Sequence, residues 1–150
     1  MSLDGKIKTV TCDGGEYQAK TIIIAGGVTA RSIDCGGEDE FLGRGVSRCG
    51  TCDAPFFKGL EVFVVGGGDA ALEEATYLTK FASKVTVIHR RGELRAAKSV
   101  QEKAFKNEKI EFMYHTIVKE IKGDGLIKSM TLQNIKDGSI TEIKADPNDG

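Results

Sequence analysis

The chain has 150 residues, enough for one domain with a hydrophobic core. Its 21 basic and 22 acidic residues give a formal net charge of −1, which argues against nucleic acid as a partner. No apolar run approaches the roughly 18 residues of a membrane span, and the N-terminus lacks a signal pattern. We therefore expect a cytoplasmic protein, in a compartment where thiols stay reduced.

The first elements are short strands. Alternating apolar and polar residues predict a strand over 7–11, and the turn signal at 13–15 predicts a hairpin with the residues that follow, 17–20. The apolar run 21–25 predicts a short buried strand that ends at the glycine pair 26–27.

Residues 28–45 are polar and rich in glycine, and we expect them to form a connector. A crossing between domains is expected near 31–37. This divides the chain into a short piece over 1–33 and a main domain over 34–150.

Periodicity then predicts a βαβ unit. A strand, a glycine turn, a helix and a second strand are expected at 61–65, 66–68, 69–81 and 84–88. A further helix, a third parallel strand and three alternating strands are expected at 96–106, 110–114, 117–121, 128–134 and 140–144. The predicted fold class is α/β, a Rossmann-like parallel sheet with helices and an added antiparallel β-meander in three layers.

The glycine turn matches a dinucleotide-phosphate loop. Gly66 allows a tight turn, Gly68 lets the backbone approach a pyrophosphate, and Ala71 lets the helix pack close to the strand. The helix start offers free N–H groups to phosphate. A plain turn in which Asp69 caps the helix is the alternative. The candidate cofactor-binding residues here are Gly66, Gly67, Gly68, Asp69, Ala70, Ala71 and Glu74.

The end of the second βαβ strand indicates which nucleotide binds. A carboxylate expected there for the ribose of NAD is missing, and His89 is followed by Arg90 and Arg91, with Arg95 nearby. Guanidinium groups bind a 2′-phosphate by charge-assisted hydrogen bonds. This pattern favours NADPH, with all four residues as candidate ligands, over a solvated basic stretch.

A Cys-x-x-Cys pair precedes the βαβ unit. Cys49 and Cys52 have the spacing of a small disulfide ring, and Asp53 can exchange protons with the thiols or serve as a turn residue. A zinc ribbon needs two such pairs, whereas Cys12 and Cys35 stand alone, so no metal site is expected.

Together these motifs resemble low-molecular-weight bacterial thioredoxin reductase, of the pyridine nucleotide-disulfide oxidoreductase family. The matching segments are 43–53, 64–75 and 89–96. The resemblance implies that Cys49 and Cys52 take electrons from FAD and reduce thioredoxin, with Asp53 as proton donor and acceptor. It implies that the arginines hold NADPH, that Ala25 and Gly26 touch FAD, and that the full enzyme is a homodimer.

That family begins with an FAD domain carrying its own GxGxxG motif, which does not precede Met1 here. We therefore expect a fragment, the NADPH domain with a piece of the FAD domain, that is inactive alone. Two alternatives remain open. One is the flavoprotein partner of a peroxiredoxin, against which the arginine cluster argues. The other is a non-catalytic nucleotide-binding or redox-sensing module.

Overall fold

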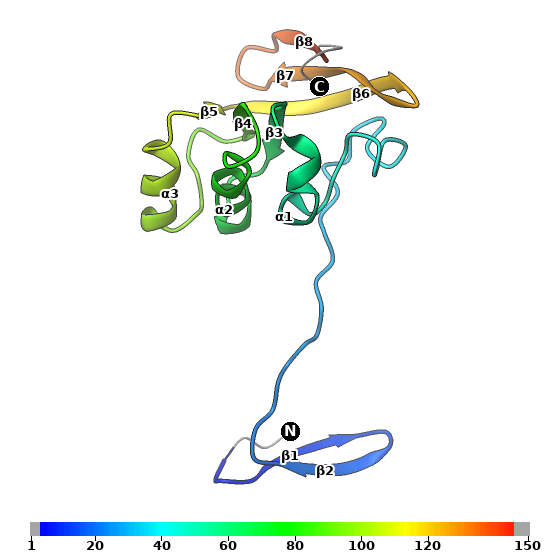
Figure 1. Cartoon of the computed structure of the whole chain (residues 1–150), viewed down its shortest axis with the longest axis vertical. Coiled ribbons are helices and arrows are strands. Elements are labelled where there is room, and N and C mark those ends of the chain that lie inside the picture. Colours follow the sequence, from blue (N-terminus) through cyan, green and yellow to red (C-terminus); the bar gives the residue numbers. More distant parts are fainter. Residues whose placement is uncertain (1–3, 146–150) are drawn as a thin grey trace. The chain divides into compact units, whose positions relative to one another are not determined.

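The computed structural model describes residues 4–145, and contacts divide the chain into two compact units. The first unit is Met1–Ala30 and the second is Arg31–Gly150. Figure 1 shows the elements of both units in chain order. No helix in residues 4–145 is both long enough and apolar enough to cross a membrane.

The first unit contains one β-hairpin. Strands β1 (Lys8–Cys12) and β2 (Gly15–Ala19) pair antiparallel around a turn at 13–14, which confirms the predicted hairpin. The strand predicted over 21–25 is wrong, because this segment has no strand partner among the described residues, and Ile23 is 91% exposed. A buried strand needs neighbouring strands to pair with and other elements that cover both of its faces. The two-stranded hairpin of this unit gives residues 21–25 neither.

The second unit has three layers, a helical layer, a parallel sheet and an antiparallel sheet (Figure 1). The parallel sheet has the order β3 (Glu61–Val65), β4 (Lys84–Ile88) and β5 (Ile110–Met113). The helices are α1 (Gly50–Asp53), the 3-10 helix η1 (Ala54–Phe57), α2 (Asp69–Leu78) and α3 (Lys98–Phe105). The antiparallel sheet is β6 (Thr116–Asp124), β7 (Leu126–Asn134) and β8 (Ile140–Lys144). The predicted α/β class and meander are confirmed.

Side-chain alternation divides the parallel sheet between two cores. The residues that pack toward the helices are Val62, Val64, Val85, Val87, Ile110 and Phe112. Those that pack toward the meander are Phe63, Ile88 and Met113. Because successive residues of a strand face opposite sides, and both sides are covered, these strands read as nearly continuous apolar runs.

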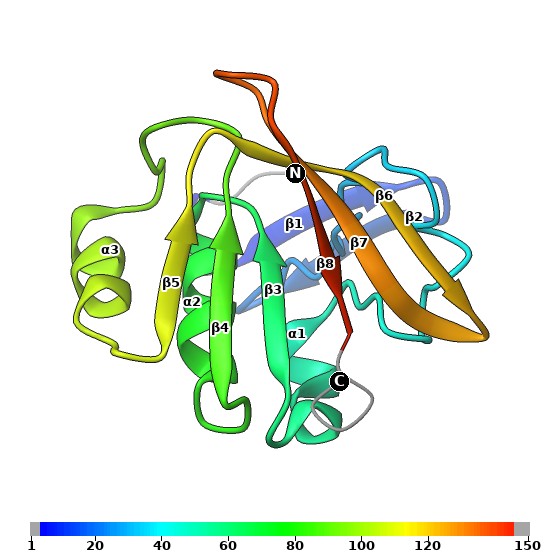
Figure 2. The same cartoon turned by 90° about the horizontal axis from the view of Figure 1, so that it is seen from above.

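Strand order explains the placement of the helices. The strands β3, β4 and β5 are neighbours in sequence order, so both crossovers run in the same direction along the sheet. Crossovers of one hand then place α2 and α3 on the same face of the sheet, as Figure 1 shows. Figure 2 shows the three strands β3, β4 and β5 side by side. The carboxyl ends of β3 and β4 consequently lie side by side, and the candidate nucleotide residues follow these ends.

The expected connector over 28–45 is wrong from Ser32 onward, because these residues pack into the second unit. Gly36 pairs with β6, donating from its N–H to Lys119 O at 3.3 Å and accepting from Ile121 N at 2.8 Å. Gly37 has φ +85°, and a Cβ there would lie 2.2 Å from Ile121 O. Phe41 is 2% exposed in the core beneath the meander.

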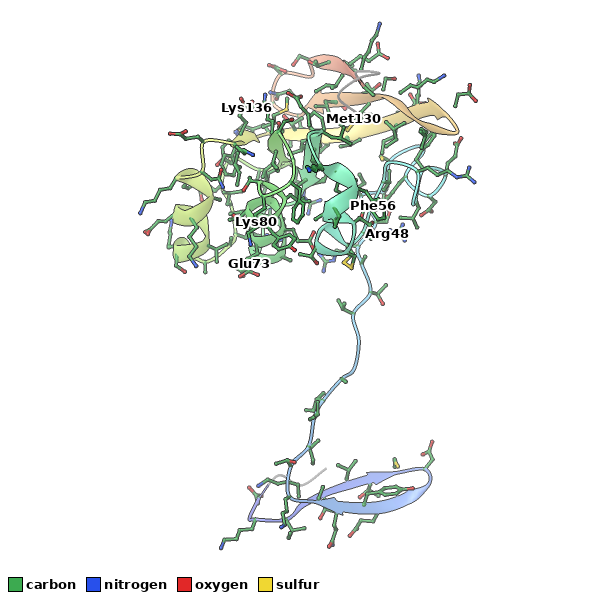
Figure 3. The ribbon with its side chains drawn as sticks, in the orientation of Figure 1. Arg48, Phe56, Glu73, Lys80, Met130 and Lys136 are labelled. Atoms are coloured by element: carbon green, nitrogen blue, oxygen red, sulfur yellow. A yellow bond between two sulfur atoms is a disulfide. The ribbon has the colours of Figure 1, made fainter. Side chains whose placement is uncertain are left out.

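The buried carboxylate of Glu38 anchors the same segment. It accepts hydrogen bonds from Ser32 Oγ (2.7 Å), Ile33 N (2.9 Å) and Asp34 N (3.2 Å). It also pairs at 3.4 Å with Arg48, the residue labelled in Figure 3. Burial acts to raise the pKa of Glu38, but these bonds outweigh it and lower that pKa. Glu38 thereby joins the start of the unit to the residue that precedes the cysteine pair.

Candidate nucleotide and dithiol sites

The glycine turn joins β3 to α2. Gly66 has φ +156°, and a Cβ on it would lie 2.7 Å from the Cβ of Ala71, so a glycine and a small helical residue are both required. Among the described residues, nothing lies within 4 Å of the position that a Cβ would take on Gly68, so this side of the backbone is open. Gly68 is the N-cap residue and no side chain caps the helix. The first turn of α2 therefore offers free N–H groups.

Asp69 does not cap the helix, which corrects the alternative of a plain capped turn. It is the first residue of α2, and its Oδ1 accepts a hydrogen bond from Ala97 N at 2.7 Å. Gly67 O accepts two further bonds, from Arg95 N at 2.7 Å and Ala96 N at 3.1 Å. These three bonds hold residues 89–97, the loop that follows β4, to the glycine turn and the first residue of α2. We call residues 89–97 the arginine loop.

The arginine loop presents positive charge beside the glycine turn. Arg90, Arg91 and Arg95 are exposed, and within residues 4–145 none of them forms an ion pair. His89 is 6% exposed, and its Nε2 lies 3.1 Å from Glu93 O. Burial lowers the pKa of His89, and the three arginines lower it further against the opposing effect of the Glu93 carbonyl. His89 is thus a buried support for the loop rather than a surface side chain.

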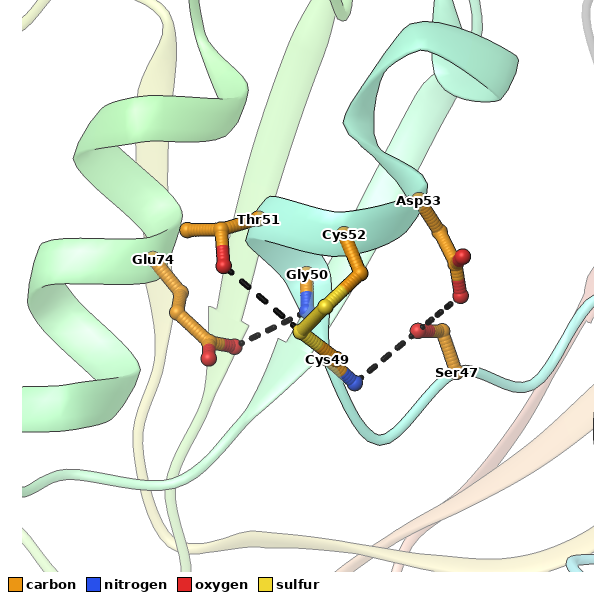
Figure 4. Close-up of a disulfide and its surroundings, with 7 residues drawn as sticks. All are labelled: Ser47, Cys49, Gly50, Thr51, Cys52, Asp53 and Glu74. Atoms are coloured by element: carbon orange, nitrogen blue, oxygen red, sulfur yellow. Dashed lines mark hydrogen bonds between the residues drawn. A yellow bond between two sulfur atoms is a disulfide. The ribbon is translucent and has the colours of Figure 1, made fainter.

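The two cysteines form a disulfide at the start of α1 (Figure 4). Cys49 is the N-cap residue, half-buried, and Cys52 is exposed within the helix. Ser47 Oγ accepts a hydrogen bond from Cys49 N at 3.1 Å and donates one to Asp53 Oδ2 at 2.6 Å. The hydroxyl of Ser47 therefore links the Asp53 carboxylate to the backbone of Cys49.

Glu74 of α2 lies beside the Cys49–Cys52 disulfide. Its Oε2 accepts a hydrogen bond from Gly50 N at 3.3 Å, so α2 contributes to both sites (Figure 4). Ala25 and Gly26, predicted to touch FAD, lie in the first unit in a segment without helix or strand.

Sequence reasoning missed the links that hold the two sites. Ser47 could have been found from its place two residues before Cys49, where a hydroxyl commonly bonds the backbone. The bond from Asp69 to Ala97 joins residues 28 apart in sequence, and no local pattern signals it.

Comparison with known proteins identifies the class. A family model described as pyridine nucleotide-disulphide oxidoreductase matches residues 2–147, so the chain belongs to that family. The chain is 56% identical over 150 residues to the thioredoxin reductase of Peptoclostridium acidaminophilum, covering 100% of this chain and 48% of that relative. The chain spans about half the length of the curated relatives it matches.

Solved structures give the same result. The thioredoxin reductase of Lactococcus lactis in its FR conformation matches with a TM-score of 0.77 and 44% identity, over 96% of this chain and 48% of that one. A ferredoxin-flavin thioredoxin reductase from Clostridium acetobutylicum matches with a TM-score of 0.59 and 31% identity, over 95% and 44%.

Proposed function

We propose that this chain is the NADPH-binding and dithiol-bearing part of an FAD-dependent thioredoxin reductase. In the whole protein, proposed to be a homodimer, electrons pass from NADPH through FAD to the Cys49–Cys52 disulfide and on to thioredoxin or a thioredoxin-like protein. The similarity to named thioredoxin reductases supports the reaction class. The geometry of the second unit supports the roles of its residues.

The arginine loop carries the argument for NADPH. Three guanidinium groups without ion-pair partners in the described chain stand on a loop that three hydrogen bonds hold to the glycine turn. Such a donor set fits the 2′-phosphate of NADPH, which a carboxylate at this place would repel. The open side of Gly68 and the uncapped start of α2 fit the pyrophosphate.

Each site residue then has a defined task. Arg90, Arg91 and Arg95 bind the 2′-phosphate, and the N–H groups that open α2 bind the pyrophosphate. NADPH, when bound, supplies a hydride. FAD is proposed to bind mainly through parts of the whole protein beyond this chain, with Ala25 and Gly26 as contacts.

The cysteine pair performs the exchange with the protein substrate. After reduction, a thiolate of the pair attacks the disulfide of thioredoxin, and a mixed disulfide forms. The second cysteine resolves it, which restores the Cys49–Cys52 bond and releases reduced thioredoxin. Asp53, held by Ser47, exchanges protons with the thiols during these steps.

Calorimetric titration of the chain with NADPH and with NADH tests the nucleotide site. We expect tighter binding of NADPH, and in Arg90→Ala a loss of about 10- to 100-fold for NADPH alone, because one charge-assisted hydrogen bond is removed. Lys119→Ala on β6 is the control, since it removes the same charge at an exposed position outside both sites.

Equal affinity for both nucleotides, or an equal loss for both in Arg90→Ala, would contradict the proposed clamp. A folded chain that binds neither nucleotide would contradict the NADPH role. It would favour another electron donor, such as the ferredoxin named for the Clostridium acetobutylicum structure.

A further inference from the structure

The carboxylate of Glu74 reaches the disulfide from the nucleotide-binding helix. Gly50 donates a hydrogen bond to Glu74 Oε2, and Gly50 is also in close contact with α2. A Cβ on Gly50 would lie 3.0 Å from Glu74 Oε2 and 3.3 Å from Leu78 Cδ1. The glycine between the two cysteines therefore allows α1 to come this close to α2. This packing fixes the Glu74 carboxylate beside the disulfide, on the opposite side from Asp53 (Figure 4).

The charge of this carboxylate is not neutralised by a neighbour. Glu74 is half-buried, and within residues 4–145 no lysine, arginine or histidine forms an ion pair with it. One backbone N–H offers a dipole but no full charge. Because partial burial weakens solvent screening, the negative charge acts on the sulfur atoms next to it.

The other charged groups near the disulfide do not offset this effect. Asp53 adds a second carboxylate, which the hydroxyl of Ser47 links to the backbone of Cys49. Arg48, directly before the pair, is bound to Asp39 at 2.6 Å and to Glu38 at 3.4 Å, so its charge is already paired. The surroundings of the reduced pair are therefore net negative.

We propose that Glu74 makes the Cys49–Cys52 pair a stronger reductant by disfavouring a thiolate on the reduced pair. Stabilising the thiolate of a reduced pair stabilises the reduced form and makes the disulfide more oxidising. A negative charge beside the thiolate destabilises it and therefore makes the disulfide less oxidising. The inference rests on the proposed redox role of the pair. It assigns to Glu74, predicted from sequence as a nucleotide ligand, an action on the dithiol.

The exchange with dithiothreitol isolates this effect. A thiolate of the reagent attacks one sulfur of the pair, the Cys49–Cys52 bond breaks, and the released sulfur leaves as a thiolate. The second sulfur of the reagent closes its ring and releases the other cysteine. Two electrons pass from the reagent to the pair, and the two reagent protons go to the cysteines or to water, depending on pH.

The experiment measures the position of this equilibrium in the full chain against pH, by trapping free thiols. The variant is Glu74→Gln, which keeps an acceptor oxygen and removes the charge. Near pH 9, where an ordinary cysteine is ionised, we expect the equilibrium to move toward the dithiol by about three- to tenfold. This corresponds to about 15–30 mV for a two-electron couple. Near pH 6, where the thiols are neutral, the difference should vanish.

Glu73→Gln is the matched control, one residue away on the exposed side of α2, and should leave the equilibrium unchanged. Gly50→Ala is a second variant that keeps the charge and displaces the flexible carboxylate, so it should shift the equilibrium in the same direction. Circular dichroism checks the folding of each variant.

Two results overturn the inference while leaving the redox role intact. One is an equilibrium in Glu74→Gln equal to that of the parent at every pH. The other is a shift that is the same at pH 6 and pH 9, which indicates altered packing rather than charge. A parent chain whose disulfide is not reversibly reduced contradicts the proposed function itself.

Discussion

The ring of His89 leaves room only for a glycine at position 67. A Cβ on Gly67 would lie 2.5 Å from both Cε1 and Nδ1 of His89, and 2.7 Å from its Nε2. The ring is 6% exposed and is held by Glu93 O, so it cannot move freely into solvent. We expect Gly67→Ala to destabilise the chain by about 1–3 kcal/mol, the usual cost of overpacking a buried contact.

Thermal unfolding followed by circular dichroism measures this cost, with an expected fall in Tm of about 2–8 °C per kcal/mol for a domain of this size. Gly68→Ala is the control on stability, because no atom of residues 4–145 lies within 4 Å of its Cβ position. It should change stability by less than about 0.5 kcal/mol. The double variant Gly67→Ala with His89→Ala should lose at least about 1 kcal/mol less free energy of unfolding than the sum of the losses in the two single variants. Additive effects in this cycle would refute the steric argument.

Two further predictions concern the same loop. Asp69→Ala should weaken NADPH binding about 2- to 10-fold by calorimetry, because the arginine loop loses the bond at Ala97 N. Asp69→Asn keeps an acceptor and removes a negative charge near the phosphates, so it should bind NADPH at least as well as the parent, and a loss equal to that of Asp69→Ala would contradict the positioning role. Burial and the neighbouring arginines lower the pKa of His89 below its ordinary 6.5, so the unfolded chain takes up a proton before the folded chain does as pH falls. Urea unfolding should therefore show stability being lost as pH falls from about 6.5 toward the folded pKa, and this slope should be weaker in His89→Gln.

Local patterns were sufficient to predict the centre of the fold. Strands β3 and β4 occupy the ranges expected from their apolar runs, because both faces of the parallel sheet are covered and most of their positions are apolar. The predicted helix 69–81 is too long, since the last residues form tight turns, with Lys80 N bonded to Tyr77 O. The requirement for glycine at position 66 was also predictable, because the close neighbour of its Cβ position is Ala71, five residues further on.

Long-range contacts account for what the sequence could not predict. The apolar run 21–25 has the composition of a buried strand, yet a strand also requires partners that composition does not reveal. The glycine-rich stretch before the dithiol resembled a connector, but Glu38 and the pairing of Gly36 with β6 hold it in the second unit. The position of Glu74 beside the disulfide depends on how closely α1 packs on α2, which no local spacing encodes.

Helix α2 joins the two proposed sites in one rigid piece. Asp69 at its start holds the arginine loop, and Glu74, about 8 Å further along at 1.5 Å per residue, reaches the disulfide. Under the proposed function, one flavin exchanges electrons with both the bound nucleotide and the disulfide. A rigid unit cannot present both to the same atom at once, so it must turn between the two steps. Because hydrogen bonds hold Ser32 and Gly36 within this unit, the backbone rotation proposed for this turn falls before Ser32, at the beginning of the crossing expected near 31–37 or ahead of it.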